Sequence, residues 1–451
     1  MLSSIYVIKL LSPDDFGLIS VGMILITILR RFETMGINTA IVQKDEVNDV
    51  EYSTGFVVKL FVSGLLLLLA YGIAPFWASF YDAEPITKIV RLLSLTLIIS
   101  SFTFLPRIQL ERNVRFQKTV MPEIIGKIAN AGLTIVLAFW GYGYMSIVWG
   151  TLGGSFVKAV LFNLFNPVAY RFSFDWQAAK QLLGFGKWVI LTSLLYWAYS
   201  YLDNAFIGKM LGTAALGFYA IAFRWGKWYS DNVQHVLSRA LFPTFSRIQN
   251  DKAKIKKSYL KLLAFNSILL IPFSLALCFL SEDFVLIVFG SKWSEAILPL
   301  QLLSIGGMFA SLNAGGSVVF LALGQPKFDT KVITINFIIT VIGLYPATVY
   351  YGINGVALLV SLSYLASCTF VLVNVSRLLQ ISFGAYLKSW GLPLLASIAM
   401  VICLYFTKSH VPKTIPGFLG MIMIGMITYF GSILILTKGT LIKEIRKLLN
   451  R

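Results

Sequence analysis

The sequence predicts an all-α polytopic membrane protein, and three of its features support this prediction. Of the 451 residues, 57% are hydrophobic and only 13% are charged, whereas an ordinary soluble domain is about 25% charged. Apolar stretches of about 20 residues, the length of a spanning helix, recur from one end of the chain to the other. Lys and Arg concentrate in alternate connections between these stretches, as they do when one set of loops faces the cytoplasm.

The apolar stretches predict thirteen complete membrane spans. In chain order they lie at 15–42, 53–78, 87–107, 119–140, 143–165, 184–208, 214–244, 258–280, 296–323, 330–350, 354–377, 387–407 and 416–437. Residues 1–11 are also apolar but are too short to cross a bilayer alone, since about 20 residues are needed. The remaining connections are short, so no soluble domain large enough for a separate function is expected.

An internal repeat relates the two halves of the chain at a shift of 200 residues. Residues 4–11 resemble 204–211, and the shift pairs Lys9 with Lys209 and Gly17 with Gly217. Repeats of this kind are typical of transporter folds. The shift also places the start of the first helix roughly 16 residues before the first residue of this sequence, so that helix is expected to be truncated.

The repeat predicts an architecture of two pseudo-repeated six-helix lobes around a central cavity, followed by a C-terminal helix pair. The expected divisions are an N-lobe at 1–165, a C-lobe at 166–378, a C-terminal helical hairpin at 379–437 and a basic cytoplasmic tail at 438–451. The tail is expected to lie on the anionic inner leaflet as a short amphipathic helix.

The charge of the chain supports this topology. The formal net charge is +18, which on a soluble chain would suggest a nucleic-acid partner. If residues 1–11 are counted as the first span, the loops after even-numbered spans, together with the tail, hold roughly three times as many Lys and Arg as the other side. This asymmetry explains the charge without nucleic acid and predicts a cytoplasmic C-terminus.

The sequence lacks the motifs of several enzyme and cofactor classes. It contains no Walker A loop, no Rossmann fingerprint, no HExxH sequence and no nucleophile elbow. It has two histidines, His235 and His410, and three cysteines that all lie within apolar stretches. We therefore expect no catalytic residue, no metal and no cofactor. No cytoplasmic loop is long enough for a nucleotide-driven domain, so transport would use an ion gradient, the membrane potential or the substrate's own gradient.

Charged residues inside the predicted spans are the candidate functional residues. A charge at membrane depth costs about 2.5–3.5 kcal/mol and usually faces the protein interior or a wet cavity. Surplus cations in a cavity would attract an anion, and Arg can clamp phosphate with two parallel hydrogen bonds. The candidate anion contacts are Arg30, Arg31, Lys59, Lys127, Arg224, Lys227 and Arg239. The candidate ion-coupling residues are Asp203, Glu33 and His235.

Structural explanations remain open for several of these residues. Arg224, Lys227, Asp231 and His235 share one helix face, and the pairs Lys227–Asp231 and Glu123–Lys127 are spaced for salt bridges within a helix. Lys59 and Lys158 are placed to snorkel towards the head groups. For His235 the sequence favours a hydrogen-bonded structural residue over a proton carrier. Asp203 is equally interpretable as the partner of a basic neighbour at the membrane edge.

Three stretches resemble the polysaccharide flippases of the multidrug/oligosaccharidyl-lipid/polysaccharide exporter superfamily, and in particular the colanic-acid and teichuronic-acid exporters. They are LLSPDDFGLISV at 10–21, LDNAFIGKMLGTAALGFYAIAFR at 202–224 and LFPTFSRIQND at 241–251. The resemblance implies a flippase rather than an enzyme. Its expected substrate is an undecaprenyl-pyrophosphate-linked oligosaccharide repeat unit, carried across the bacterial inner membrane by alternating access for exopolysaccharide, O-antigen or colanic-acid-type biosynthesis. Expected partners are membrane lipids, a polysaccharide polymerase and glycosyltransferases.

Other functions remain as alternatives. A multidrug or metabolite antiporter, or a lipid II flippase, would use the same fold, but a cation exporter needs acidic residues in its cavity and the charges within these spans are mostly basic. A membrane-embedded glycan polymerase or ligase would need a long periplasmic loop with catalytic residues. The longest expected outside loops, near 78–91 and 281–295, are too short for that. A purely structural scaffold would gain nothing from so many costly charges.

Overall fold

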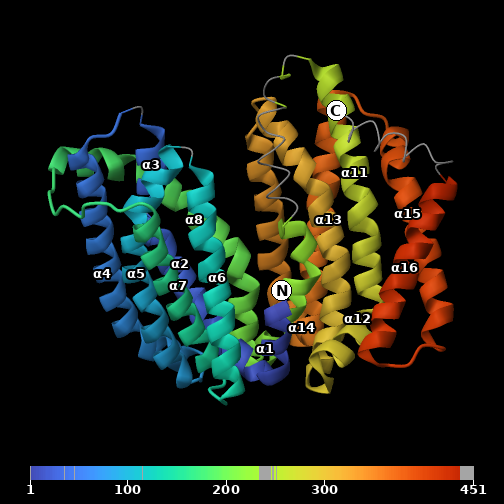
Figure 1. Cartoon of the computed structure of the whole chain (residues 1–451). Helices are drawn as coiled ribbons and strands as arrows, with labels where there is room; N and C mark the ends of the chain where they lie inside the picture. Colours follow the sequence, from blue (N-terminus) through green and yellow to red (C-terminus); the bar gives the residue numbers. More distant parts are fainter. Residues whose placement is uncertain are drawn as a thin grey trace. The chain divides into compact units, whose positions relative to one another are not determined.

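The structure is a computed structural model that describes residues 2–34, 36–44, 46–113, 115–232, 245, 248–249 and 251–436. The chain divides into two compact units, which are unit 1, Met1–Gly217, and unit 2, Phe218–Arg451. Within the described residues, all regular secondary structure is helical. Figure 1 shows each unit as a bundle of long helices that run alongside one another.

Unit 1 is built from eight helices and the start of a ninth. They are α1 (Leu2–Leu10), α2 (Pro13–Thr34), α3 (Ile37–Gln43), α4 (Asp49–Phe80), α5 (Pro85–Arg112), α6 (Phe116–Phe139), α7 (Met145–Phe165), α8 (Trp176–Met210) and α9 (Thr213–Gly226). Helix α5 packs against α4, α2 and α7, while α6 lies along α7. Asn48 and Glu51 form a capping box that starts α4, and the Asp175 side chain caps α8, because free backbone amides at a helix start need an acceptor.

Unit 2 contains the other described helices. It comprises the end of α9, α11 (Lys252–Phe279), α12 (Ser281–Asp283), the π-helix η1 (Phe284–Phe289), the 3₁₀-helix η2 (Ser291–Ala296), α13 (Ile297–Ala322), α14 (Lys327–Leu379), α15 (Phe383–Lys408) and α16 (Ile415–Leu436). Helix α11 packs between α13 and α15, and α14 lies along α13. The pair α15–α16 forms the predicted C-terminal hairpin.

The helices confirm a multi-pass membrane protein. Among the described residues, nine helices are long and apolar enough to cross a bilayer, namely α4, α5, α6, α7, α11, α13, α14, α15 and α16. The most apolar 18-residue segment of α16 is only 22% buried within the protein, and that of α4 only 28%. Most of the surface of these two segments is therefore apolar and faces outward. Such a surface is unfavourable in water but matches the hydrocarbon of a membrane.

The predicted spans correspond to helices, with a few corrections. The span at 15–42 is interrupted at Gly36, whose φ of 68° separates α2 from α3. The segment α14 contains two helices that break at Gly352, where φ is 57° and ψ is −144°, so the predicted division between the spans at 330–350 and 354–377 is confirmed. The segment 281–295, expected to be a loop, forms α12, η1 and η2 because Phe284, Phe289 and Trp293 are buried. Of the span at 214–244, residues 233–244 lie outside the described residues.

The boundary between the two units lies further along the chain than the predicted boundary between lobes. The sequence places the start of the C-lobe at 166, whereas unit 1 extends to Gly217. The reason is the packing of α8, which contacts α2, α3 and α4. Trp197 on α8 donates a hydrogen bond to Thr27 on α2, and Lys209 pairs with Asp82 at 2.9 Å.

A close crossing joins the first turns of α2 and α9. A Cβ atom added to Gly17 would lie 1.7 Å from the Thr213 carbonyl oxygen, and one added to Gly217 would lie 1.8 Å from the Pro13 oxygen. Residues 13 and 17 become 213 and 217 at the shift of 200 found in the sequence, so the contact is reciprocal between repeat-related positions. The repeat itself stays a prediction, and the contact fixes how closely the starts of α2 and α9 approach.

The crossing yields the first prediction. Gly17→Ala forces a methyl group against a backbone oxygen that cannot rotate away, so we expect it to cost about 3 kcal/mol of stability. The measurement is thermal unfolding of the purified protein in detergent. Gly64→Ala in α4 is the matched control, since an added Cβ there meets no atom within 4 Å. Equal midpoints for the two variants would contradict the close approach.

Candidate functional site

A buried ion pair lies in the interior of unit 1. Lys59 on α4 donates to Glu33 on α2 at 2.6 Å, and the two side chains are 6% and 4% exposed. The Ser100 hydroxyl on α5 donates a further hydrogen bond to the same carboxylate oxygen, and the Phe104 ring lies 5.7 Å from the Lys59 ammonium. Glu33 and Lys59 neutralise each other here, which is how two charges become tolerable away from water.

Arg30 lies one turn before Glu33 on α2 and faces the same part of the bundle. It donates to the Thr96 hydroxyl on α5 at 2.9 Å and interacts electrostatically with Glu33. Thr96 in turn donates to the Leu93 carbonyl, so its oxygen is oriented to accept from Arg30. Arg31 is partly buried on the adjacent face of the same helix.

A second group of charges, which we call the cation cluster, comes from four helices. Its members are Arg30 of α2, Arg107 of α5, Lys127 of α6 and Lys158 of α7. Glu123 of α6 lies among them, 3.6 Å from Arg107 and 4.0 Å from Lys158. Arg107 also binds Glu111 at 2.7 Å. Arg30, Arg107 and Lys127 all lie close enough to Lys158 for their charges to repel it.

Glycines on α6 and α7 allow this arrangement. A Cβ added to Gly126 would lie 2.9 Å from the Lys158 Cβ, and one added to Gly154 would lie 2.7 Å from the Gly126 oxygen. Small residues at such crossings let helix backbones approach closely. The approach brings Lys158 beside the turn of α6 that carries Glu123 and Lys127, although the sequence separates them by more than thirty residues.

The cation cluster can bind an anion. Its four cations exceed the two carboxylates Glu111 and Glu123, which leaves a formal charge of +2. The Arg107, Glu123 and Lys158 side chains are 43%, 30% and 32% exposed, so a solute can reach them. Cations supported by several helices hold phosphate groups well, because Arg and Lys donate charge-assisted hydrogen bonds. Among the described residues, His, Cys, Asp and Glu form no group of three able to hold a metal ion.

The structure places the remaining predicted residues as follows. Lys227 pairs with Asp231 at 3.6 Å, which confirms that intrahelical pair, and it donates to the Tyr364 hydroxyl at 2.9 Å. Arg224 lies in the last turn of α9. Asp203 is buried on α8, where its carboxylate accepts hydrogen bonds from the Asn204 backbone and side-chain amides. Arg239 and His235 lie outside the described residues.

Sequence reasoning missed two members of the cation cluster and chose one wrong partner. The sequence predicts Arg107 in a loop, and it leaves Lys158 open between snorkelling and a charge that faces the protein interior. The pair Glu123–Lys127 was expected from its spacing, but Glu123 instead pairs with Arg107 and Lys158 of neighbouring helices. The sequence did contain a signal that Arg107 is helical. Arg107 and Glu111 are four residues apart, the spacing of an ion pair within a helix, which indicates that α5 continues past Arg107.

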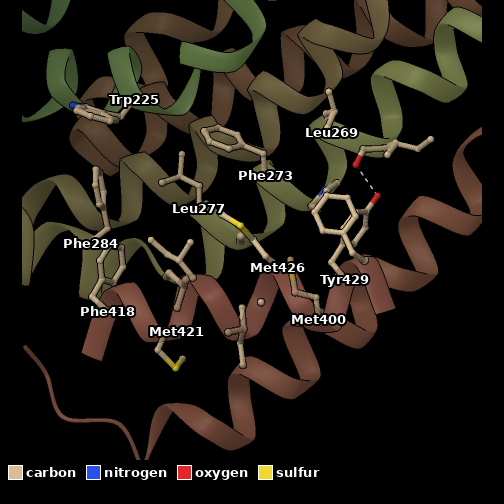
Figure 2. A pocket seen from close by; sticks show the side chains of 18 residues that line it. Trp225, Leu269, Phe273, Leu277, Phe284, Met400, Phe418, Met421, Met426 and Tyr429 are labelled. Atoms are coloured by element: carbon tan, nitrogen blue, oxygen red, sulfur yellow. Dashed lines mark hydrogen bonds between the residues drawn. The ribbon is translucent and has the colours of Figure 1, made fainter. Parts of the chain in front are cut away.

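Unit 2 contains a large apolar pocket between α11 and the hairpin α15–α16 (Figure 2). Its cavity volume is about 490 Å³, and Phe273, Leu277, Met421 and Met426 are among the side chains that line it. Tyr429 also lines the pocket, and its hydroxyl is satisfied by the Ile268 carbonyl at 2.6 Å. The wall is therefore formed almost entirely by carbon and sulfur, which suits a hydrocarbon chain.

An ionic group lies at a second, smaller pocket, which shares Phe418 and Met421 with the first. Lys408, at the end of α15, lies 3.1 Å from Glu282 and 2.9 Å from Asp283. The hydrogen bond from Lys408 holds the pKa of Glu282 below its ordinary value. These contacts tie the loop of the hairpin to α12, next to Phe418 and Met421.

Comparisons with known proteins agree with one another. The family model described as polysaccharide biosynthesis protein matches residues 7–298. The chain is 25% identical over 406 residues to the lipopolysaccharide biosynthesis protein WzxC of Escherichia coli K12, which covers 88% of this chain and 81% of that protein. It is 24% identical over 383 residues to the teichuronic acid biosynthesis protein TuaB of Bacillus subtilis, which covers 82% and 77%.

A solved structure shows the same fold. The structure of the lipid II flippase MurJ in its inward closed conformation superposes with a TM-score of 0.81 at 16% identity, and covers 98% of this chain and 97% of that chain.

The buried pair yields the second prediction. Glu33→Gln leaves the Lys59 ammonium without its counter-charge, which we expect to cost about 3–5 kcal/mol of stability. The double variant Glu33→Gln/Lys59→Met removes both charges and should recover most of that loss. The measurement is thermal unfolding of the wild type, both single variants and the double variant in detergent. If the stability loss of the double variant equalled the sum of the losses of the two single variants, the two side chains would not depend on each other.

Proposed function

Because the chain belongs to the polysaccharide biosynthesis protein family, we propose that it is a flippase. In this proposal it carries undecaprenyl-pyrophosphate-linked oligosaccharide repeat units across the bacterial inner membrane by alternating access, for exopolysaccharide, O-antigen or colanic-acid-type biosynthesis. The observation that carries the proposal is the cation cluster in unit 1, where basic side chains from four helices lie near one another and two of them, Arg107 and Lys158, share the Glu123 carboxylate.

The head group of this substrate is matched by the cation cluster. A pyrophosphate diester bears two negative charges, which equal the surplus charge of the cluster. Arg30, Arg107 and Lys158 supply donors directed from three helices, so phosphate oxygens would exchange water for hydrogen bonds to protein. Without such partners, moving phosphate and sugar hydroxyls into hydrocarbon would cost several kcal/mol for each polar group. Lys127 is the fourth cation of the cluster, and Arg31 follows Arg30 on α2.

The position of the cluster suits loading from the cytoplasmic leaflet. Arg30, Arg107, Glu123 and Lys158 each lie within seven residues, or about 10 Å, of the helix ends at Thr34, Arg112, Phe116 and Phe165. The loops beyond these ends are among those that the positive charges assign to the cytoplasm. The same rule gives the proposed cytoplasmic C-terminus.

The lipid tail is matched by the apolar pocket of unit 2. A polyprenyl chain has no polar group to satisfy, and the pocket between α11, α15 and α16 offers methionine and aromatic side chains that adapt to irregular hydrocarbon. In this proposal, part of the tail occupies the pocket and the remainder stays among the lipids.

The alternatives fit the charges less well. A multidrug antiporter with a cationic cargo would need unpaired carboxylates, whereas the buried Glu33 is neutralised by Lys59. A lipid II flippase would also bind a lipid-linked pyrophosphate, and the name of the matching family favours a polysaccharide precursor instead.

The proposed transport makes and breaks no covalent bond. A polymerase and glycosyltransferases are proposed partners, because the substrate must be assembled before transport and consumed after it.

The third prediction concerns the head group. Arg30→Gln with Lys158→Gln removes two of the four cations, and we expect at least tenfold slower translocation, since each lost charge-assisted contact counts for roughly 1.5–3 kcal/mol. The measurement is the rate at which a lipid-linked oligosaccharide becomes accessible on the far side of proteoliposomes. Lys88→Gln, an exposed lysine at the opposite end of α5, is the control. Wild-type rates in the double variant would remove the cluster from the transport path.

The fourth prediction concerns the tail. Gly425→Leu fills the apolar pocket, because a Cβ at Gly425 already reaches van der Waals contact with Leu404 and Met400. We expect weaker binding of undecaprenyl pyrophosphate, about tenfold for the loss of two or three buried methylene contacts, and unchanged binding of inorganic pyrophosphate. Gly431→Leu on the same helix meets no neighbour within 4 Å and should bind both as the wild type does. Equal effects of the two variants would argue against a tail site here.

A further inference from the structure

Glu123 is held differently from Glu33, the carboxylate of the buried ion pair. Its nearest cations are at 3.6 Å and 4.0 Å, longer than the 2.7–2.9 Å of a charge-assisted hydrogen bond. Arg107 makes its short contact, 2.7 Å, with Glu111 instead. Glu33, in contrast, is bound by Lys59 at 2.6 Å and is enclosed. Attraction at a distance, rather than hydrogen bonding, therefore keeps Glu123 between its two cations.

Exposure also distinguishes the two carboxylates. The Glu123 side chain is 30% exposed and its partners are 43% and 32% exposed, whereas the buried pair is almost closed to solvent. Arg107 and Lys158 come from two helices other than that of Glu123, so movement of the Glu123 side chain separates it from both without breaking a helix. The backbone at this point is fixed by the crossing of Gly126 and Gly154, so the side chain alone has to move.

We propose that Glu123 is an internal competitor for the anion site, a carboxylate that occupies the place of a phosphate between Arg107 and Lys158 when no substrate is bound. The inference rests on the proposed function, since it assumes that the cation cluster receives the pyrophosphate. A phosphate group brings more acceptor oxygens than a carboxylate and displaces it. The carboxylate then returns when the head group leaves.

This role explains why a site for an anion contains an acid. Four cations without a competing carboxylate would hold pyrophosphate tightly and release it slowly, because affinity differences at one site are expressed mainly in the dissociation rate. A carrier needs binding that is favourable enough to load and weak enough to unload, as in ion channels. Glu123 is thus a positioning residue that acts through Arg107 and Lys158 and sets the affinity of the site.

The test measures inorganic pyrophosphate binding to the full-length protein in lipid nanodiscs by isothermal titration calorimetry. Glu123→Gln should bind about tenfold more tightly, which is the effect of removing one repelling charge roughly 4 Å from the anion at a partly exposed site. Glu123→Gln/Lys158→Gln should lose that gain. Glu84→Gln is the matched control, because it makes the same charge change where α5 begins, roughly 35 Å from Arg107, and should bind as the wild type does.

Each outcome decides the inference. Unchanged or weaker binding by Glu123→Gln, with binding by the wild type, overturns the competitor role and leaves the proposed function standing. Equal tightening by Glu84→Gln overturns it as a general charge effect. Absence of binding in every variant overturns it as well, and the proteoliposome assay of Arg30→Gln/Lys158→Gln then decides separately whether the proposed function falls. Glu123→Ser replaces the glutamine variant if that variant does not fold.

Discussion

The cost of holding a charge away from water governs the interior of unit 1. Glu33 and Lys59 offset this cost by forming an ion pair at 2.6 Å, and the Ser100 hydroxyl donates a further hydrogen bond to Glu33. Such a pair adds little net stability compared with apolar residues of the same size. Its consequence is specificity, because α2, α4 and α5 must keep one register for these three side chains to meet. The same constraint makes the cation cluster a few turns away informative, since its four cations exceed the two described carboxylates that pair with them, Glu111 and Glu123.

Close helix packing determines which charges meet. The crossing of α6 and α7 at Gly126 and Gly154 places Lys158 near Glu123. Helix α5 packs against α7, and this packing places Arg107 near the same carboxylate. With larger side chains at these glycines the helices would separate by several ångströms, and the carboxylate would no longer reach both cations. The chemistry of the cluster thus depends on residues that have no side chain.

The candidate sites of the two units differ in chemical character. Unit 1 presents cations and serine and threonine hydroxyls, whereas the pocket of unit 2 is lined almost wholly by apolar side chains. A lipid-linked pyrophosphate has the same division within one molecule, with a charged head and a long hydrocarbon tail. The head requires polar partners and the tail requires apolar surroundings, and a protein that carries this molecule must provide both. The proposed flippase function unites these two observations with the family to which the chain belongs.

Much of the fold could be predicted because it depends on composition and on runs of apolar residues. The membrane class, the helical spans and the C-terminal hairpin follow from the length of those runs, since a bilayer accepts only helices of that length with satisfied backbone groups. The pair Lys227–Asp231 could also be predicted, because both residues lie on one helix and their spacing alone brings them together.

The charged site depended on tertiary structure. Lys59 and Glu33 lie on different helices, as do Glu123, Arg107 and Lys158, and the period of one helix contains no information about which helix faces it. Spacing therefore suggested Lys127 as the partner of Glu123, while the packing at Gly126 brought Lys158 instead. The sequence by itself determined that charges enter the membrane. Only the folded bundle decided which of them neutralise one another and which remain for an anion, because that choice depends on distances between helices.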